Sequence, residues 1–215
     1  IIIGNVAAIM QSSVKRMLAY SSIAHAGYAL VGFVGAGMAT TTEARDIAIA
    51  AVAFYMLTYA VTNLGAFAIV TLLSQKNDRR TEFDDYNGIG FKSPVLAFSL
   101  SLFMLSLLGM PLTAGFIGKV LVFRPALEAG NTLITILVVV AVLGSAISAY
   151  YYLRLIVVMF FRERTSDWHT PKMAAPMTAA LVITVLGVFY FGIFGDSVIS
   201  KFAQSPAAPV VKAER

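Results

Sequence analysis

The sequence predicts an all-α polytopic membrane protein, and three observations lead to that prediction. Hydrophobic residues make up 59% of the 215 residues, whereas charged residues make up only 13%. The mean hydropathy is +0.81. Apolar runs long enough to cross a bilayer follow one another, and the charged residues gather between them. A soluble domain of this length needs a larger charged fraction to cover its surface, so that class is excluded.

The apolar runs predict one membrane domain, residues 12–195, flanked by two short ends. Residues 1–11 have no basic n-region and no cleavage site, so they resemble the end of a truncated transmembrane helix rather than a signal peptide. We therefore expect the chain to be the C-terminal part of a longer protein. Residues 196–215 are rich in Ala and Pro and are expected to form a poorly ordered tail.

Five transmembrane helices are expected within this domain. Each apolar run is long enough to cross the hydrocarbon core at about 1.5 Å per residue. The expected helices cover about 15–38, 47–73, 94–124 (broken at 109–115), 132–161 and 175–195.

Basic residues are distributed unequally between alternate loops, which predicts the orientation of the chain. The loops at 11–16, 74–93 and 162–173 hold Lys15, Arg16, Lys76, Arg79, Arg80, Lys92, Arg162, Arg164 and Lys172. The opposite side holds Arg45, Arg124, Lys201, Lys212 and Arg215. Basic loops stay cytoplasmic, so we expect the C-terminus on the periplasmic side. The net charge of +5 lies in the loops, so it indicates the orientation of the chain in the membrane rather than a surface that binds nucleic acid.

The third apolar run is interrupted by the stretch GMPLTAGFIGK, residues 109–119. Pro111 removes a backbone donor, and Gly109 and Gly115 loosen the helix on either side. Broken helices survive in lipid only where they are buried or line a hydrated cavity, and they mark ion sites in many transporters. A simple proline kink is the alternative interpretation.

Lys119 follows the break and is the leading candidate for a functional residue. Gly115 lies one turn before it on the same face, which is expected to leave room beside the amine for water or a partner. Burial disfavours the charged form of an amine, so a lysine there could gain and lose a proton. The alternative is that the side chain reaches outward to the membrane surface. We favour a proton-relay role.

Two further spans offer polar residues for a proton path. His25 is the one histidine inside an expected span, and its chemistry suits proton transfer near pH 7. Lys15 stands at the start of the same span, where anchoring is its default role. Tyr59 and Asn63 are four residues apart in the next span and could hold a chain of water molecules. The alternative for His25 is a buried histidine whose hydrogen bond to a neighbouring hydroxyl is purely structural. The alternative for Tyr59 and Asn63 is polar packing between helices.

Several residue types are absent in informative ways. The chain has no cysteine, which excludes disulfides, CxxC zinc sites and iron–sulfur ligation within it. No cofactor or metal site is expected. No acidic residue lies in the middle of a span, so a carboxylate partner for Lys119 would have to come from outside this sequence. Arg154 lies about two turns before the end of its span and is expected to be structural.

Two motifs resemble the antiporter-like subunits of respiratory complex I, the proton-translocating NADH:quinone oxidoreductase. SVKRMLAYSSIAHAGYALVG resembles that family's KR-x-LAYSS-x-x-H-x-G element. GMPLTAGFIGKVLVF resembles its G-x-P-x-x-x-G-F-x-x-K element, and YAVTNLGAFAIV is most similar to the N-type members. The resemblance covers nearly the whole chain.

This resemblance implies the second inverted repeat of the family's fold, with one discontinuous helix, plus a final helix in a bacterial inner membrane. Lys119 would match the lysine of the discontinuous helix, and Lys15 and His25 would match positions near the charged axis of the membrane arm. The partners would be other membrane-arm subunits and the lipid bilayer, with NADH and quinone bound by other chains. The alternatives are a subunit of a multisubunit cation/proton antiporter or of a membrane-bound hydrogenase, and a non-pumping structural subunit.

Overall fold

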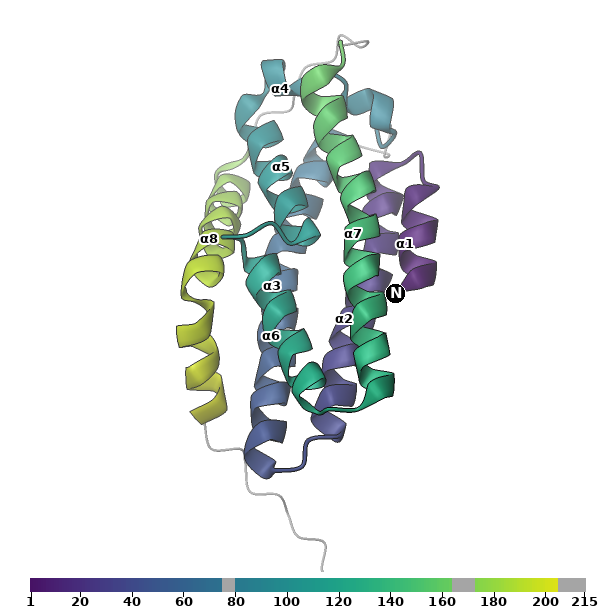
Figure 1. The fold of residues 1–215 in the computed structure, drawn as a ribbon. Coiled ribbons are helices and arrows are strands. Elements are labelled where there is room, and N and C mark those ends of the chain that lie inside the picture. The colour runs from purple at the N-terminus through teal and green to yellow at the C-terminus, as the bar shows by residue number, and fades with distance from the viewer. Residues whose placement is uncertain (75–79, 164–172, 205–215) are drawn as a thin grey trace, which may run out of the picture.

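A computed structural model describes residues 1–74, 80–163 and 173–204, and these residues form a bundle of α-helices (Figure 1). The helices are α1 (Ile2–Ile9), α2 (Val14–Gly37), α3 (Thr42–Ser74), the 3₁₀ helix η2 (Phe83–Tyr86), α4 (Ile89–Lys92), α5 (Pro94–Leu108), α6 (Ala114–Glu128), α7 (Thr132–Phe161) and α8 (Ala175–Gln204). The all-α prediction is therefore confirmed.

Four of these helices, α2, α3, α7 and α8, are long and apolar enough to cross a membrane by their length and composition. The fifth expected span is divided into two. Figure 1 shows α5 in the upper half of the bundle and α6 in the lower half, joined by a connection at mid-height. Together the two half-helices make one discontinuous helix, which agrees with the predicted fold.

The helix ends follow from local sequence. Ser13 is the N-cap of α2, where its side chain accepts a hydrogen bond from the backbone nitrogen of Arg16. Asn131 plays the same part for α7, accepting from the nitrogen of Leu133 at 2.9 Å. Pro94 occupies the first turn of α5, where its missing N–H costs nothing.

Helix boundaries depart from expectation in three places. The discontinuous helix, expected to end at about 124, continues to Glu128. The helix expected at about 47–73 begins already at Thr42, with Glu43 in its first turn. The last helix, expected to end near 195, continues to Gln204 across non-helical backbone angles at Phe194. Residues 196–204, expected in the tail, are thus helical, and the rest of that tail lies outside the described residues.

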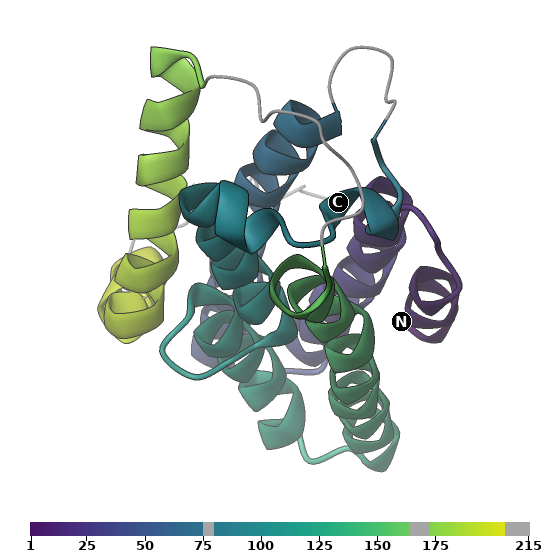
Figure 2. The ribbon, with the colours of Figure 1, turned by 90° about the horizontal axis from the view of Figure 1, so that it is seen from above.

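One end of the bundle gathers the connections for which a cytoplasmic location is expected. The nitrogen of Val14 donates to the carbonyl of Thr81 at 2.7 Å, and the nitrogen of Gly88 donates to the carbonyl of Val158 at 3.2 Å. Figure 2, which looks onto this end, shows α8 and α1 at opposite edges of the bundle. Of the basic residues expected here, Lys76, Arg79, Arg164 and Lys172 lie outside the described residues.

The interior consists of two apolar clusters with a polar layer between them. The first cluster lies near the connections just described, where α5 packs against the adjacent halves of α2, α3 and α7. The second cluster lies toward the opposite end, where α6 packs against the other halves of the same three helices. Buried polar side chains gather where the two clusters meet. These are Ser21, His25, Thr58, Thr62, Ser106, Lys119 and Ser148. The break between α5 and α6 lies in this layer.

Candidate functional site: a lysine at the break of a discontinuous helix

The break in the discontinuous helix covers residues 109–113. Helix α5 stops at Leu108 because Gly109 adopts φ +94°, a left-handed conformation that glycine accepts without steric cost. Pro111 lies in the connection beyond that cap, where it prevents the helix from resuming. The break was expected to reach residue 115, but Gly115 already lies in the first turn of α6.

Gly115 brings α6 close to α5. A methyl group on this residue would overlap the carbonyl oxygen of Ser106, and the nitrogen of Gly115 donates to the Ser106 hydroxyl oxygen at 3.2 Å. That hydroxyl also lies 3.3 Å from the hydroxyl of Thr62 on α3. Gly115 was expected to leave room beside the amine for water or a partner, and in the structure the backbone of α5 takes that room.

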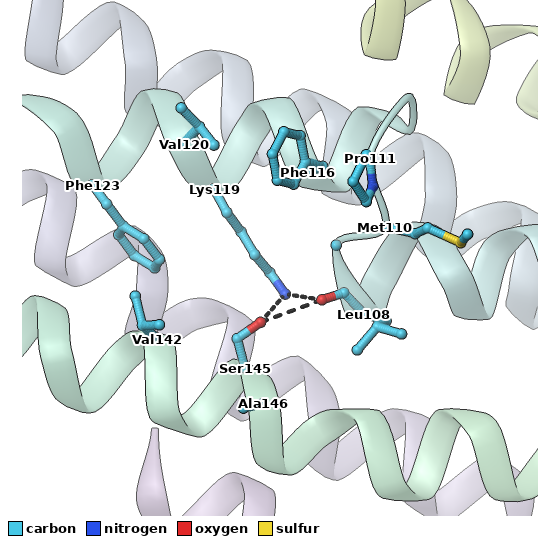
Figure 3. Close-up of a pocket in the computed structure, with 11 residues that line it drawn as sticks. Leu108, Met110, Pro111, Phe116, Lys119, Val120, Phe123, Val142, Ser145 and Ala146 are labelled. Carbon is cyan, nitrogen blue, oxygen red and sulfur yellow. Dashed lines mark hydrogen bonds between the residues drawn. The ribbon is translucent and has the colours of Figure 1, made fainter.

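The ammonium group of Lys119 points back to the end of α5 (Figure 3). Its Nζ donates to the carbonyl oxygens of Leu107 and Leu108, each at 2.9 Å, and to the hydroxyl oxygen of Ser145 on α7 at 2.7 Å. The residue is 6% exposed. The alternative in which this side chain reaches outward to the membrane surface is excluded by this geometry.

These hydrogen bonds complete the C-terminus of α5. The carbonyl of Leu105 accepts from the nitrogens of Gly109 and Met110, and that of Ser106 accepts from the nitrogen of Gly109. The carbonyls of Leu107 and Leu108 accept from Lys119. The last carbonyls of a helix carry about half a negative charge through the aligned peptide dipoles, so a cation is favoured there. The helix end thus stabilises the ammonium without a carboxylate. A carboxylate from outside the chain is not needed to satisfy its three N–H groups.

A pocket of about 470 Å³ lies beside the ammonium, between the break and α7. Apart from Lys119 and Ser145, its walls are mainly apolar side chains, as Figure 3 shows. Outer wall residues such as Val120 and Val142 are about half exposed, so the pocket opens at the side of the chain rather than at either end. The pocket therefore connects the flank of the described chain to the polar layer.

His25 lies in the same layer, surrounded by tyrosines. Its Nδ1 is 2.7 Å from the hydroxyl of Tyr55, and its Nε2 is 3.3 Å from the hydroxyl of Tyr152. The ring of Tyr59 stacks on the imidazole at 4.7 Å between centroids, and the ring of Tyr28 meets its edge at 5.5 Å. Phenol hydroxyls can both donate and accept, so either tautomer of the histidine is satisfied.

Tyr28 connects the histidine to the lysine. The Nζ of Lys119 lies 5.3 Å from the centroid of the Tyr28 ring, a cation–π distance. The Tyr28 hydroxyl accepts from the amide of Asn5 on α1 at 3.3 Å, and the amide oxygen of Asn5 accepts from the hydroxyl of Tyr151 at 2.9 Å. Lys119, Tyr28 and His25 therefore form a continuous line of contacts across the polar layer.

The other sequence-predicted residues lie at different distances from this line. Tyr59 belongs to it, because it stacks on His25 and donates to the Ser22 hydroxyl at 2.6 Å. Lys15 lies in the first turn of α2, at the end of the bundle. The buried side-chain oxygen of Asn63 has no hydrogen-bond partner among the described residues. The structure therefore joins Tyr59 to the site but not Asn63 or Lys15.

Sequence reasoning missed Asn5, Tyr28, Tyr151, Tyr152 and Ser145. A signal existed for Ser145, since it is one of few hydroxyl residues in the apolar run of α7. The triple tyrosine at 150–152 was no guide, because Tyr150 is 60% exposed whereas its two neighbours are buried.

Arg154 has structural contacts away from the polar layer, and the acidic residues form no metal-binding cluster among the described residues. Arg154 donates to the carbonyl of Gln11 at 3.3 Å and lies 4.1 Å from the centroid of the Phe83 ring, so it ties α7 to the end of the bundle. Among the residues that the structure describes, no group of three His, Cys, Asp or Glu side chains could hold a metal ion.

Known proteins share both the sequence and the fold. Residues 1–148 match the model of the NADH:quinone oxidoreductase/Mrp antiporter transmembrane family. NADH-quinone oxidoreductase subunit N of Trichlorobacter lovleyi is 47% identical over 204 residues, covering 94% of this chain and 39% of that protein. This chain thus spans about two-fifths of the length of that relative.

Solved structures give the same result. A chain of respiratory complex I from Thermus thermophilus with bound aureothin is 36% identical, with a TM-score of 0.74 over 93% of this chain and 42% of that one. A chain of the Mrp complex from a Dietzia species has a TM-score of 0.75 over 94% of this chain and 43% of that one, but at 19% identity it shows the fold alone. The chain is a multi-pass membrane protein, and it belongs to the NADH:quinone oxidoreductase/Mrp antiporter transmembrane family as a relative of the N subunits.

Proposed function

We propose that the chain is part of an N-type membrane-arm subunit of NADH:quinone oxidoreductase and that it carries a section of the proton-translocation path. The proposal assigns the subunit to a bacterial inner membrane, where it lies beside other membrane-arm subunits. NADH and quinone bind to other subunits, so this chain moves protons and performs no redox step.

The burial of Lys119 supports this function above the other observations. The residue is 6% exposed, and its ammonium lies at a helix break and donates to three neutral acceptors. It also stands at the start of a line of titratable side chains. Ionisable groups are costly inside a bilayer and mark ion or proton pathways. In the proposed path, a proton reaches Lys119 and passes along the Tyr28 and His25 contacts, with water filling the gaps that exceed hydrogen-bonding distance. Tyr59 and Ser22 extend the line along α2 and α3.

Lys15 and Asn63 remain candidates for the ends of this path. Lys15 lies at the end of the bundle for which a cytoplasmic location is expected, where a path between the polar layer and that surface would end. The buried oxygen of Asn63, without a partner among the described residues, is a place where a bound water would be stabilised. Moving one elementary charge against 100 mV costs about 2.3 kcal/mol, and we infer that rearrangements in the rest of the complex supply it.

Deleting the gene from its native host distinguishes an oxidoreductase subunit from an antiporter subunit. We expect the deletion strain to lose proton uptake and quinone reduction driven by NADH in membrane vesicles, while its growth in high sodium and at alkaline pH is unchanged. Re-expression of the full-length protein is the control. Normal NADH-driven quinone reduction together with sodium sensitivity would instead identify an antiporter subunit.

The proposed orientation predicts which connections a thiol reagent reaches. The 215 residues contain no cysteine. Thr40→Cys between α2 and α3 and Glu163→Cys after α7 each place a thiol at an exposed position, and the two positions lie at opposite ends of the bundle. Each is compared with the full-length protein without the substitution. A membrane-impermeant maleimide is expected to label Thr40→Cys from the periplasm and Glu163→Cys only in inverted vesicles. The reverse pattern would overturn the orientation.

A further inference from the structure

Three acceptors surround the ammonium of Lys119, and they differ in what they can do after a proton leaves. The ammonium has three N–H groups, which go to the carbonyls of Leu107 and Leu108 and to the hydroxyl oxygen of Ser145. A neutral amine has two N–H groups and one lone pair, which needs a donor. A peptide carbonyl can only accept, whereas a serine hydroxyl can accept or donate.

We propose that Ser145 is the reversible hydrogen-bond partner of Lys119, a positioning residue that satisfies both protonation states of the amine. With the ammonium, the hydroxyl oxygen accepts from Nζ at 2.7 Å and its own proton points to the carbonyl of Leu108 at 3.3 Å. After deprotonation, the hydroxyl rotates and donates to the lone pair, while the two carbonyls keep the two remaining N–H groups. The proton count balances, because one proton leaves the amine and none leaves the serine.

The position of Ser145 favours this role. It is partly exposed on the wall of the 470 Å³ pocket, whereas Lys119 is 6% exposed. A proton that leaves the amine toward the pocket therefore passes beside the serine hydroxyl. Helix α7 holds the serine in place, since the hydroxyl of Ser148 donates to the Ser145 carbonyl at 2.5 Å. The inference rests on the proposed function, because it matters only if Lys119 changes its protonation state.

Other titratable groups near Lys119 come from three helices. Helix α2 contributes Tyr28 and His25, α3 contributes Tyr55, which lies beside Gly118, and α7 contributes Tyr152 at the second nitrogen of His25. Neither Leu108 of α5 nor the α7 residues on the pocket wall can titrate. Among the described residues, Ser145 is thus the one whose hydroxyl lies within hydrogen-bonding distance of the amine.

The test compares serine variants in the assembled, full-length complex and follows NADH-driven proton uptake in inverted vesicles against pH. Ser145→Ala removes both the acceptor and the donor, and a hydrogen bond to a charged group changes an equilibrium by about tenfold or more. The bond to the charged ammonium is stronger than the bond to the neutral amine, so its loss disfavours the protonated state more. We therefore expect the pH at which proton uptake is half-maximal to move by about one unit toward lower pH. Ser145→Thr retains a hydroxyl and is expected to keep the native midpoint.

Ser101→Ala is the matched control. Ser101 is buried in the middle of α5, and its hydroxyl donates to the carbonyl of Ala97 in its own helix rather than to a titratable group of the described residues. Its alanine variant is expected to keep the native midpoint. Loss of packing alone would lower the amount of active complex without moving the midpoint, so the pH profile separates positioning from structure.

Three outcomes overturn the inference. The first is a Ser145→Ala complex with the native midpoint, and the second is a Ser101→Ala complex with the same shift. If Ser145→Ala does not assemble, Ser145→Val is compared with Ser145→Thr, which has the same shape. The third outcome is an equal pH midpoint in these two variants. Proton uptake that survives in Lys119→Arg would instead contradict the proposed function, so the two failures are distinguishable.

Discussion

Lys119→Arg is expected to lower NADH-driven proton uptake by about two orders of magnitude, the range for loss of a positioned proton-transfer group. Arginine keeps a positive charge and several N–H donors, so it can still bind the carbonyls of Leu107 and Leu108 at the end of α5. Its guanidinium does not release a proton at working pH, so it cannot act as a relay. This variant therefore separates capping of the helix from proton transfer.

The measurement follows acidification inside inverted vesicles, with reduction of a water-soluble acceptor by NADH as a check that the complex is assembled. Lys92→Arg is the control, because Lys92 is an exposed residue at the end of α4. Lys119→Met, which leaves the two carbonyls without donors, is expected to reduce assembly as well. An assembled Lys119→Arg complex that pumps at the native stoichiometry would show that Lys119 is structural.

Gly115→Ala is expected to lower the amount of assembled complex severalfold. The added methyl group would overlap the carbonyl oxygen of Ser106, which belongs to the backbone and cannot rotate away. Separating α5 from α6 would weaken the hydrogen bond from the Gly115 nitrogen to the Ser106 hydroxyl and shift the end of α5 away from Lys119. Overpacking of this kind costs about 1–3 kcal/mol and sometimes more.

Gly37→Ala is the matched control for this substitution. Gly37 ends α2, and an added methyl group there would meet no atom within 4 Å. Alanine also favours a helix over glycine by about 1 kcal/mol, so this variant is expected to assemble as well as the native chain. Quantifying the subunit in purified complex decides the matter, and equal amounts of the two variants would show that the close approach at Gly115 is dispensable.

The break and the choice of Lys119 as a candidate could be predicted from the sequence because both depend on local chemistry. Gly109 and Pro111 act on their own backbone, and a lysine in an apolar run is costly wherever the run is placed. The partners of the lysine could not be predicted in this way. Two of them are carbonyl groups of Leu107 and Leu108, which every residue possesses, and their exposure depends on where α5 stops.

The aromatic surroundings of His25 were also beyond sequence reasoning. Its hydrogen bonds reach Tyr55 and Tyr152, which lie 30 and 127 positions away along the chain. Helical periodicity relates residues within one helix, as it did for Tyr59 and Asn63, but says nothing about which helices become neighbours. The expectation of water between those two residues treated α3 alone, whereas Tyr59 is held by Ser22 of α2.

The ammonium of Lys119 belongs to one half of the divided span, and two of its acceptors belong to the other. Its preference for the charged form is therefore sensitive to the gap between the halves, since a displacement of about half an ångström already lengthens both 2.9 Å contacts beyond their favourable range. A displacement of either half-helix would therefore change the protonation equilibrium of Lys119 through the carbonyls of Leu107 and Leu108, without the movement of any acidic side chain.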